Sequence, residues 1–336
     1  MTLVHALRAE AKRMLVSPVT LTAVILSLLI GAGIAAAIVG LASPYEDNYM
    51  MDAHQLSSLA DDAGAATEAA KAEDGALTTG IVPGPAGEQL YVSSDYQVVC
   101  ANESCTKIWR EVPMDLDYLS TQAATSTTML ITVLAVGFAL LLVGSDAGNG
   151  ALTTQLTFTP NRRRLLAAKS LVASAGGMTL MVIGHVVSQS ILLVGFIAQR
   201  SYQEVGAWPE LVPGVARATL LAGILAMAAA FVVFLAGDAR LAAAVTVGIV
   251  LVAYFTTPWV SSAPDSFDAP FLLLNPLVSY AAFLDPPVSI DFYAADRGYS
   301  SSIEVSFAQA FGIAIAWLFV LGALGYLRFT RRDIKD

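Results

Sequence analysis

Charged residues are scarce in this sequence. They make up 13% of the 336 residues, whereas hydrophobic residues make up 56%. A soluble protein of this size carries about 25% charged residues. This balance excludes an ordinary soluble domain and indicates an integral membrane protein. The net charge of −9 disfavours nucleic acid as a partner.

Catalytic and metal-binding motifs are also missing from the sequence. The chain has no Gly-Lys pair, so it cannot build a P-loop, and neither His-Glu-x-x-His nor Gly-x-Ser-x-Gly occurs. The three histidines, His5, His54 and His185, are scattered along the chain. We therefore predict no catalytic residue, no metal site and no cofactor in this chain. If its work requires ATP, another chain hydrolyses it.

Only two cysteines are present, Cys100 and Cys105, and four residues separate them. Both lie in the long polar segment that follows the first apolar run. If this segment is extracytoplasmic, a local disulfide is permitted there. So small a ring would fix a turn and add little global stability.

Long apolar runs divide the chain. We predict six membrane-spanning helices and hence an all-α polytopic membrane protein. The expected spans are residues 21–41, 128–143, 171–197, 215–236, 241–255 and 307–327. The first is longer than the apolar core of a signal peptide, about 7–15 residues, so we expect it to stay uncleaved.

The predicted organisation follows from these spans. Residues 1–19 are amphipathic and basic, as in an interfacial helix, and Pro18 turns the chain into the bilayer. The remaining parts are a first span in residues 20–42, an extracytoplasmic module in 43–125, spans two to five in 126–255 with a cytoplasmic loop in 145–169, an extracytoplasmic and re-entrant segment in 256–306, and the last span with its tail in 307–336.

Two of these segments carry further patterns. In residues 43–125, an Ala-rich and acidic stretch at 45–74 predicts a helix, and two β-rich runs around Ser94 and Asp95 predict a hairpin, so the module is α/β-like. Residues 271–284 are apolar, broken at Asn275 and Pro276, and too short to span, which favours a re-entrant or interfacial segment.

Charge sets the orientation. With the N-terminus inside, the inner segments hold 12 of the 18 basic residues and 5 of the 27 acidic residues, a net charge of +7. Lys and Arg in short loops beside spans stay cytoplasmic. We predict a multi-pass protein of the cell membrane with both termini in the cytoplasm.

The cytoplasmic loop is the most informative stretch. Residues 150–158 predict a short helix with Leu152, Leu156 and Phe158 on roughly one side. Pro160 ends it, and three arginines, Arg162 to Arg164, follow. Apolar side chains on such a loop are typical of a contact with a partner.

One polar face interrupts the third span. His185, Ser188 and Gln189 share a helical face by their spacing. They could line a translocation path, with Asn275 as a further candidate, or they could hydrogen-bond to a neighbouring helix.

These features together resemble the permease subunit of type-2 ABC transporters. The family's loop pattern has a Glu where Asp146 stands, then Gly150, a Thr replaced here by Ala151, and Leu156, Pro160, Arg163 and Lys169. The resemblance covers nearly all the chain except residues 43–125. It implies that the loop couples the permease to separate ATPase subunits through the residues Asp146, Gly150, Leu152, Leu156, Phe158, Arg162 and Arg163.

The function that the resemblance implies is export of an amphipathic or apolar substrate, such as a drug, peptide or lipid. Two permeases, identical or paralogous, would pair in the bilayer above ATPase subunits that bind ATP and Mg²⁺. The alternative is a non-transporting sensor or assembly scaffold whose extracytoplasmic module binds a partner. A membrane-embedded enzyme fits less well, because no catalytic motif is present.

The charge distribution generates a test of topology. In sealed cells, a membrane-impermeant thiol reagent should label Ser94→Cys and Ser301→Cys, each in a background without the two native cysteines. It should not label Thr159→Cys until the membrane is opened. External labelling of Thr159→Cys would contradict the inside-positive arrangement.

Overall fold

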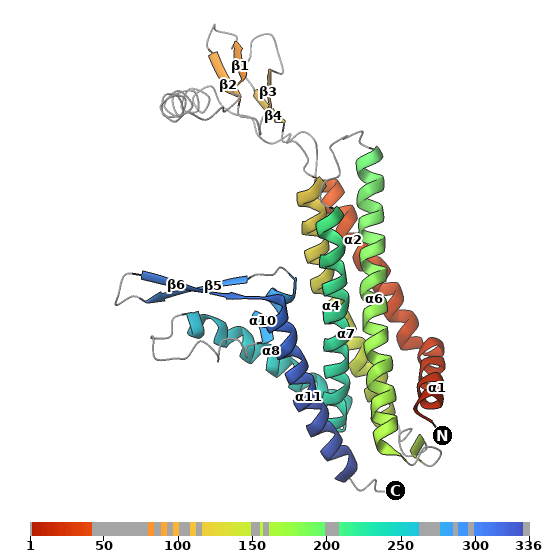
Figure 1. The fold of residues 1–336 in the computed structure, drawn as a ribbon. Coiled ribbons are helices and arrows are strands. Elements are labelled where there is room, and N and C mark those ends of the chain that lie inside the picture. Colours follow the sequence, from red (N-terminus) through yellow and green to blue (C-terminus); the bar gives the residue numbers. More distant parts are fainter. Residues whose placement is uncertain are drawn as a thin grey trace. The chain divides into compact units, whose positions relative to one another are not determined.

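The computed structural model describes residues 2–41, 80–83, 89–92, 97–100, 108–111, 116–148, 155–156, 161–198, 208–261, 276–284, 288–294 and 299–331. It divides into two compact units. One contains residues 1–36, 120–194 and 205–336, and the other contains residues 37–119 and 195–204. The first is a bundle of helices, and the strands β1 to β4 belong to the second (Figure 1).

The chain begins with two helices separated by a sharp break. Helix α1 spans Leu3–Val16, and the Thr2 side chain caps it by accepting from the backbone N–H of His5. Ser17 is extended, with φ −73° and ψ 133°, as expected for a residue before proline. Pro18 then starts α2, Pro18–Leu41, where its missing N–H costs no helical hydrogen bond. The predicted break at Pro18 is confirmed.

The other long helices are α4 (Leu116–Gly148), α6 (Arg162–Ala198), α7 (Trp208–Ala236), α8 (Ala239–Ser261) and α11 (Phe307–Arg331). Within the described residues, five helices are long and apolar enough to cross a bilayer: α2, α4, α6, α7 and α11. The predicted fifth span lies in α8, whose apolar part, Ala239–Tyr254, is shorter. The chain is a multi-pass, mainly helical membrane protein, and the count of six spans stays a prediction.

Two helices extend well beyond the spans predicted for them. Helix α4 begins at Leu116, within the segment that the sequence analysis gave to the polar module, and α6 begins at Arg162. The first turns of α4 contain Ser120, Thr121 and Gln122, and α6 opens with three arginines. Hydropathy marks the apolar part of a helix only, so polar turns at its ends are missed.

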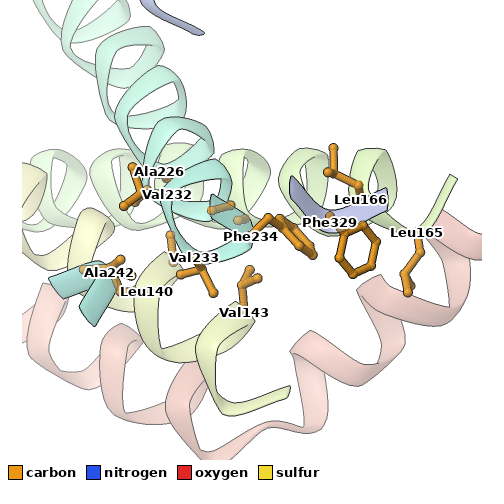
Figure 2. Close-up of a cluster of buried hydrophobic side chains, with 14 residues drawn as sticks. Leu140, Val143, Leu165, Leu166, Ala226, Val232, Val233, Phe234, Ala242 and Phe329 are labelled. Carbon is orange, nitrogen blue, oxygen red and sulfur yellow. The ribbon is translucent and has the colours of Figure 1, made fainter. Parts of the chain in front are cut away.

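Three apolar clusters form the core of the helical bundle. The inner cluster joins α4, α6, α7, α8 and α11 and includes Val143, Leu165, Val233 and Phe329 (Figure 2). In it, the rings of Phe234 and Phe329 lie 5.0 Å apart. A middle cluster joins α2, α4, α6 and α7 through the residues Ala23, Ile131, Ala135, Phe138, Leu180, Met181, Ala218 and Ala222. A third cluster packs α7 against α10 and α11.

Small residues let the helices approach closely. A Cβ added to Gly31 of α2 would collide with the carbonyl oxygen of Gly184 of α6. Next to this contact, the Ser27 hydroxyl donates to the Leu180 carbonyl at 2.7 Å. Packing of this kind is characteristic of membrane helices, because lipid tails are as apolar as leucine and only close contact favours association.

The predicted tight turn between α7 and α8 is present. Gly237 has a φ of 78°, a conformation that glycine adopts without a steric penalty. The Asp238 carboxylate accepts from the backbone N–H groups of Arg240 and Leu241. It therefore caps the start of α8 and stabilises it electrostatically.

The segment before α11 contains a helix and a hairpin. Helix α10, Pro276–Leu284, begins at the predicted break. Strands β5 (Val288–Ala294) and β6 (Tyr299–Val305) pair antiparallel, with Asp291 opposite Ser302 (Figure 1). The sequence analysis missed this hairpin. Its signal was the run of β-branched and aromatic residues on either side of Asp296, Arg297 and Gly298.

The second unit contains four short strands: β1 (Gly80–Pro83), β2 (Gln89–Val92), β3 (Gln97–Cys100) and β4 (Ile108–Glu111). Strand β1 pairs with β2, and β3 pairs with β4. The predicted hairpin around Ser94 and Asp95 is therefore wrong, because β2 pairs with β1 and β3 pairs with β4. Residues 45–74, predicted as a helix, lie outside the described residues.

The contact between α2 and α6 generates a matched test of packing. Gly31→Ala should destabilise the protein by about 1–3 kcal/mol, since the added methyl group meets a backbone carbonyl that cannot move aside. Gly33→Ala on the same helix should change stability little, because nothing lies within 4 Å of its Cβ position. Thermal unfolding of both variants in detergent measures the difference, and equal midpoints would contradict the close approach.

Candidate functional site

Four charged side chains from three helices meet at one end of the bundle. Glu10 and Arg13 lie three residues apart on α1 and so share a helical face. Asp146 lies near the end of α4, and Lys169 lies in the early turns of α6. We call these four residues the ion cluster.

The contacts of the ion cluster form a continuous network. Lys169 donates to the Glu10 carboxylate, with Nζ to Oε2 at 3.1 Å, and also to the Asp146 carboxylate. Both terminal nitrogens of the Arg13 guanidinium bind Asp146, one to each carboxylate oxygen. Arg13 also lies 3.8 Å from Glu10. Asp146 therefore binds one cation on α1 and another on α6.

Burial makes these contacts important for stability. The side chains of Asp146 and Lys169 are each 3% exposed, and that of Glu10 is 14% exposed. Two acids and two bases leave the cluster neutral. A buried ion pair contributes little relative to an apolar pair, but removing one member leaves an uncompensated charge and costs about 3–5 kcal/mol.

A small pocket adjoins the ion cluster. It is lined by the four charged residues together with Met14, Leu142, Val143 and Val172. Its volume is about 10 Å³, which is close to the minimum for one water molecule. The pocket is too small for a substrate, so the cluster is a structural joint between helices and has no transport cavity of its own.

The arginines that open α6 bind the end of α11. Arg162 donates to the carbonyl groups of Phe329 and Thr330, both at 3.0 Å. Its guanidinium carbon lies 5.9 Å from the centre of the Phe329 ring. Arg163 donates to the Tyr326 hydroxyl and lies 5.1 Å above that ring. Arg162 thus binds two of the last carbonyls of α11, where the helix dipole favours positive charge, while Arg163 binds a side chain of the same helix.

The predicted coupling residues are thus only partly described. Asp146, Arg162 and Arg163 make contacts within the chain, and Leu156 is half-buried against the inner apolar cluster. Gly150, Leu152 and Phe158 lie outside the described residues. The sequence analysis assigned Leu156 to a partner, but here it packs against its own core.

The predicted polar face of α6 lies against α4. His185 Nε2 is 3.0 Å from the Thr128 hydroxyl, and Ser188 accepts from the Thr127 hydroxyl at 3.3 Å. Gln189 donates to the Ser120 carbonyl at 3.2 Å. The sequence analysis left two interpretations of this face, a translocation path or hydrogen bonds to a neighbouring helix. These contacts are hydrogen bonds of the second kind. The fourth candidate, Asn275, lies outside the described residues.

The predicted disulfide stays a prediction. Cys100 ends strand β3, and Cys105 lies outside the described residues.

Sequence reasoning missed the role of α1 in the site. It treated Glu10 and Arg13 as charges on an interfacial helix and did not connect them with Asp146 or Lys169. The available signal was two opposite charges, Asp146 and Lys169, at the ends of consecutive spans, facing a helix with Glu and Arg three residues apart. Charges that the fold buries require partners of the opposite sign.

Comparison with known proteins identifies the family. The model of the ABC-2 family transporter proteins matches residues 6–334, nearly the whole chain. No curated protein matches the sequence. The chain therefore belongs to the ABC-2 family of transporter proteins, as its resemblance to type-2 ABC permeases indicated. It is the membrane component of a transporter.

The ion cluster generates a double-mutant test. Lys169→Met should destabilise the protein by about 3–5 kcal/mol, because Asp146 and Glu10 would keep one negative charge in excess. The pair Lys169→Met with Asp146→Leu should lose clearly less than the sum of the two single variants, since Glu10 and Arg13 then balance each other.

Lys12→Met is the control, because Lys12 is an exposed lysine on α1 and its removal should change stability little. Unfolding by denaturant in micelles measures all four variants. Strict additivity of the two cluster substitutions would show that the four charges are not coupled.

Proposed function

Starting from this family membership, we propose that the protein is the permease subunit of an ATP-driven exporter. It moves an amphipathic or apolar substrate outward across the cell membrane. Two permeases, identical or paralogous, pair in the bilayer, and separate ABC-type ATPase subunits bind the cytoplasmic side. ATP and Mg²⁺ bind to those subunits, since this chain has no P-loop sequence.

The observation that supports this proposal best is how the loop between α4 and α6 is anchored. Just before the loop, Asp146 binds α1 through Arg13 and α6 through Lys169. Just after it, Arg162 and Arg163 bind α11. A displacement of this loop would therefore act on four helices together.

The strength of these anchors suits a mechanical role. Hydrogen bonds to charged groups contribute about 1.5–3 kcal/mol each. The inner apolar cluster packs directly beside them and joins α4, α6, α7, α8 and α11. Close-packed interiors are stiff and transmit strain. A displacement of the loop by an ATPase subunit would thus move the adjoining ends of these helices together, as one rigid unit.

Charge supports the orientation. Arg8, Lys12, Arg164, Arg328 and Arg331 are exposed on α1, α6 and α11. These lie in the segments that the inside-positive count assigns to the cytoplasm. The loop therefore faces the compartment that contains ATP.

The proposal predicts the effect of Phe158→Ala. This substitution should weaken copurification of the ATPase subunit, or uncouple ATP hydrolysis from substrate, while membrane insertion is unchanged. An aromatic anchor in a partner pocket contributes about 2 kcal/mol or more, which corresponds to roughly thirtyfold in affinity. Copurification and substrate-stimulated ATP hydrolysis in lipid nanodiscs measure the two effects.

Two controls separate coupling from folding. Phe319→Ala removes a ring that is 77% exposed on the membrane-spanning part of α11 and should leave both measurements unchanged. Leu156→Ala removes a side chain from the inner apolar cluster and should lower thermal stability instead. If Phe158→Ala copurifies with the ATPase subunit and couples hydrolysis as the wild type does, the loop does not have its proposed role.

A further inference from the structure

Two of the basic side chains of α1 face away from the bundle. Arg8 and Lys12 are exposed, and neither makes an ion pair within the part of the chain that the structure describes. Arg13 of the same helix instead binds Asp146. Around the helix axis, Arg13 lies about 140° from Arg8 and about 100° from Lys12, at about 100° per residue. The bundle therefore uses one cation of α1 and leaves two on the outward side.

No acidic side chain offsets this charge within α1. Glu10 is the only acidic residue of the helix, and its side chain is 14% exposed and binds Lys169 of α6. It lies on the same side as Arg13 and takes part in the neutral ion cluster. Arg8 and Lys12 thus give the outward side of α1 a net charge of +2.

Exposed apolar side chains lie next to these two charges. Val4 is 65% exposed and Leu15 is 72% exposed. Around the helix axis, Leu15 lies about 20° from Val4, and Arg8 and Lys12 follow in the same direction at about 40° and 80°. The outward side thus combines an apolar strip with an adjoining basic strip. Helices that lie at a membrane interface have this arrangement.

The end of α1 lies at a membrane boundary. Only Ser17 separates α1 from α2 (Figure 1), and α2 is long and apolar enough to cross a bilayer from Pro18 onward. Leu15 and Val16, which is 83% exposed, are therefore within one turn of a membrane-spanning segment. At such a boundary, long basic side chains lay their stems along apolar groups and extend their charges to the lipid phosphates.

The charge of the outward side selects among lipids. Each Lys or Arg beside an anionic leaflet strengthens binding by about fivefold, whereas a neutral leaflet offers no net attraction. The apolar strip favours a bilayer over an acidic protein surface, because acyl chains cover exposed side chains without a matching pocket. The partner that fits both strips is an anionic phospholipid.

We propose that the outward side of α1, formed by Val4, Arg8, Lys12 and Leu15, binds anionic phospholipids of the leaflet in which α2 begins. This inference goes beyond the proposed function and does not rest on it. Arg8 and Lys12 bind the head groups, and the apolar strip lies among the upper parts of the acyl chains. Because the ion cluster fixes the other side of α1 to α4 and α6, bound lipid stabilises the arrangement of all three helices.

Fluorescence quenching beside α1 tests the lipid preference. The full-length chain, without its two native cysteines, receives a bimane label at Ala9→Cys, an exposed position next to Arg8. It is placed in phosphatidylcholine nanodiscs that contain rising fractions of 5-doxyl phosphatidylglycerol or 5-doxyl phosphatidylcholine, which share one quencher and differ in head group. We expect half-quenching at an at least about fivefold lower mole fraction of the anionic lipid. Equal half-quenching by the two lipids would overturn the proposal.

Matched variants assign the preference to the two residues. In Arg8→Gln with Lys12→Gln, the two half-quenching fractions should agree within about twofold. Arg8→Lys with Lys12→Arg keeps both charges and should keep the preference. Arg328→Gln with Arg331→Gln removes the same charge from exposed positions on α11 and should also keep it. An unchanged preference in the first variant, or an equal loss in the α11 variant, contradicts the assignment.

Two further measurements complete the test. Raising the salt from about 50 mM to about 500 mM should at least halve the preference of the unmutated helix, since exposed charges are screened, and this needs no α1 charge variant to fold. Phosphatidylglycerol should also raise the thermal midpoint of the wild type and leave that of Arg8→Gln with Lys12→Gln unchanged. If the anionic lipid has neither effect and the double variant loses copurification of the ATPase subunit, this side of α1 belongs to a protein partner and the lipid proposal fails.

Discussion

The structure depends on one constraint, which is that the bilayer interior offers no water to polar groups. Each donor and acceptor at that depth must therefore find a partner in the protein. Helices satisfy the backbone, and several hydroxyls bond to a carbonyl one turn earlier, as Ser170 does to Leu166 and Thr179 to Ala175. The Ser27 hydroxyl instead bonds to Leu180 on another helix. The same rule decides where charges are placed.

At the end of the bundle where α1 packs, this constraint makes charged side chains hold helices together. Asp146 and Lys169 are almost completely buried, so each needs an opposite charge, and α1 supplies both partners through Arg13 and Glu10. An amphipathic helix that could otherwise move along the membrane surface is thereby fixed to α4 and α6. After the loop, Arg162 fixes α11 by binding carbonyls that a helix end leaves without partners, and Arg163 binds the Tyr326 hydroxyl of the same helix.

Sequence patterns predicted those features of the fold that depend on neighbouring residues in the chain. The break at Pro18, the turn at Gly237 and the start of α10 after Asn275 follow from backbone preferences of single residues, and the long apolar runs mark helices α2, α4, α6, α7 and α11. Pairing across the chain was not predictable in this way. Strand β2 pairs with β1 and not with β3, and Asp146 meets Arg13, which lies 133 residues away. The sequence shows that charges such as Asp146 and Lys169 need partners, but the packed fold selects which residues at such separations become those partners.

The polar contacts between the helices differ in strength between the end of the bundle and its membrane-spanning part. The ion cluster is neutral, and each of its charges has an opposite partner, as a permanent joint requires. Within the span, α4 and α6 are joined by hydrogen bonds between side chains, from the Thr127 hydroxyl to Ser188 and between Thr128 and His185. Interhelical hydrogen bonds of this kind contribute about 0.6 kcal/mol each on average, whereas the loss of one member of a buried ion pair costs about 3–5 kcal/mol. The ion cluster therefore fixes the ends of α4 and α6 more firmly than the hydrogen bonds fix their membrane-spanning parts.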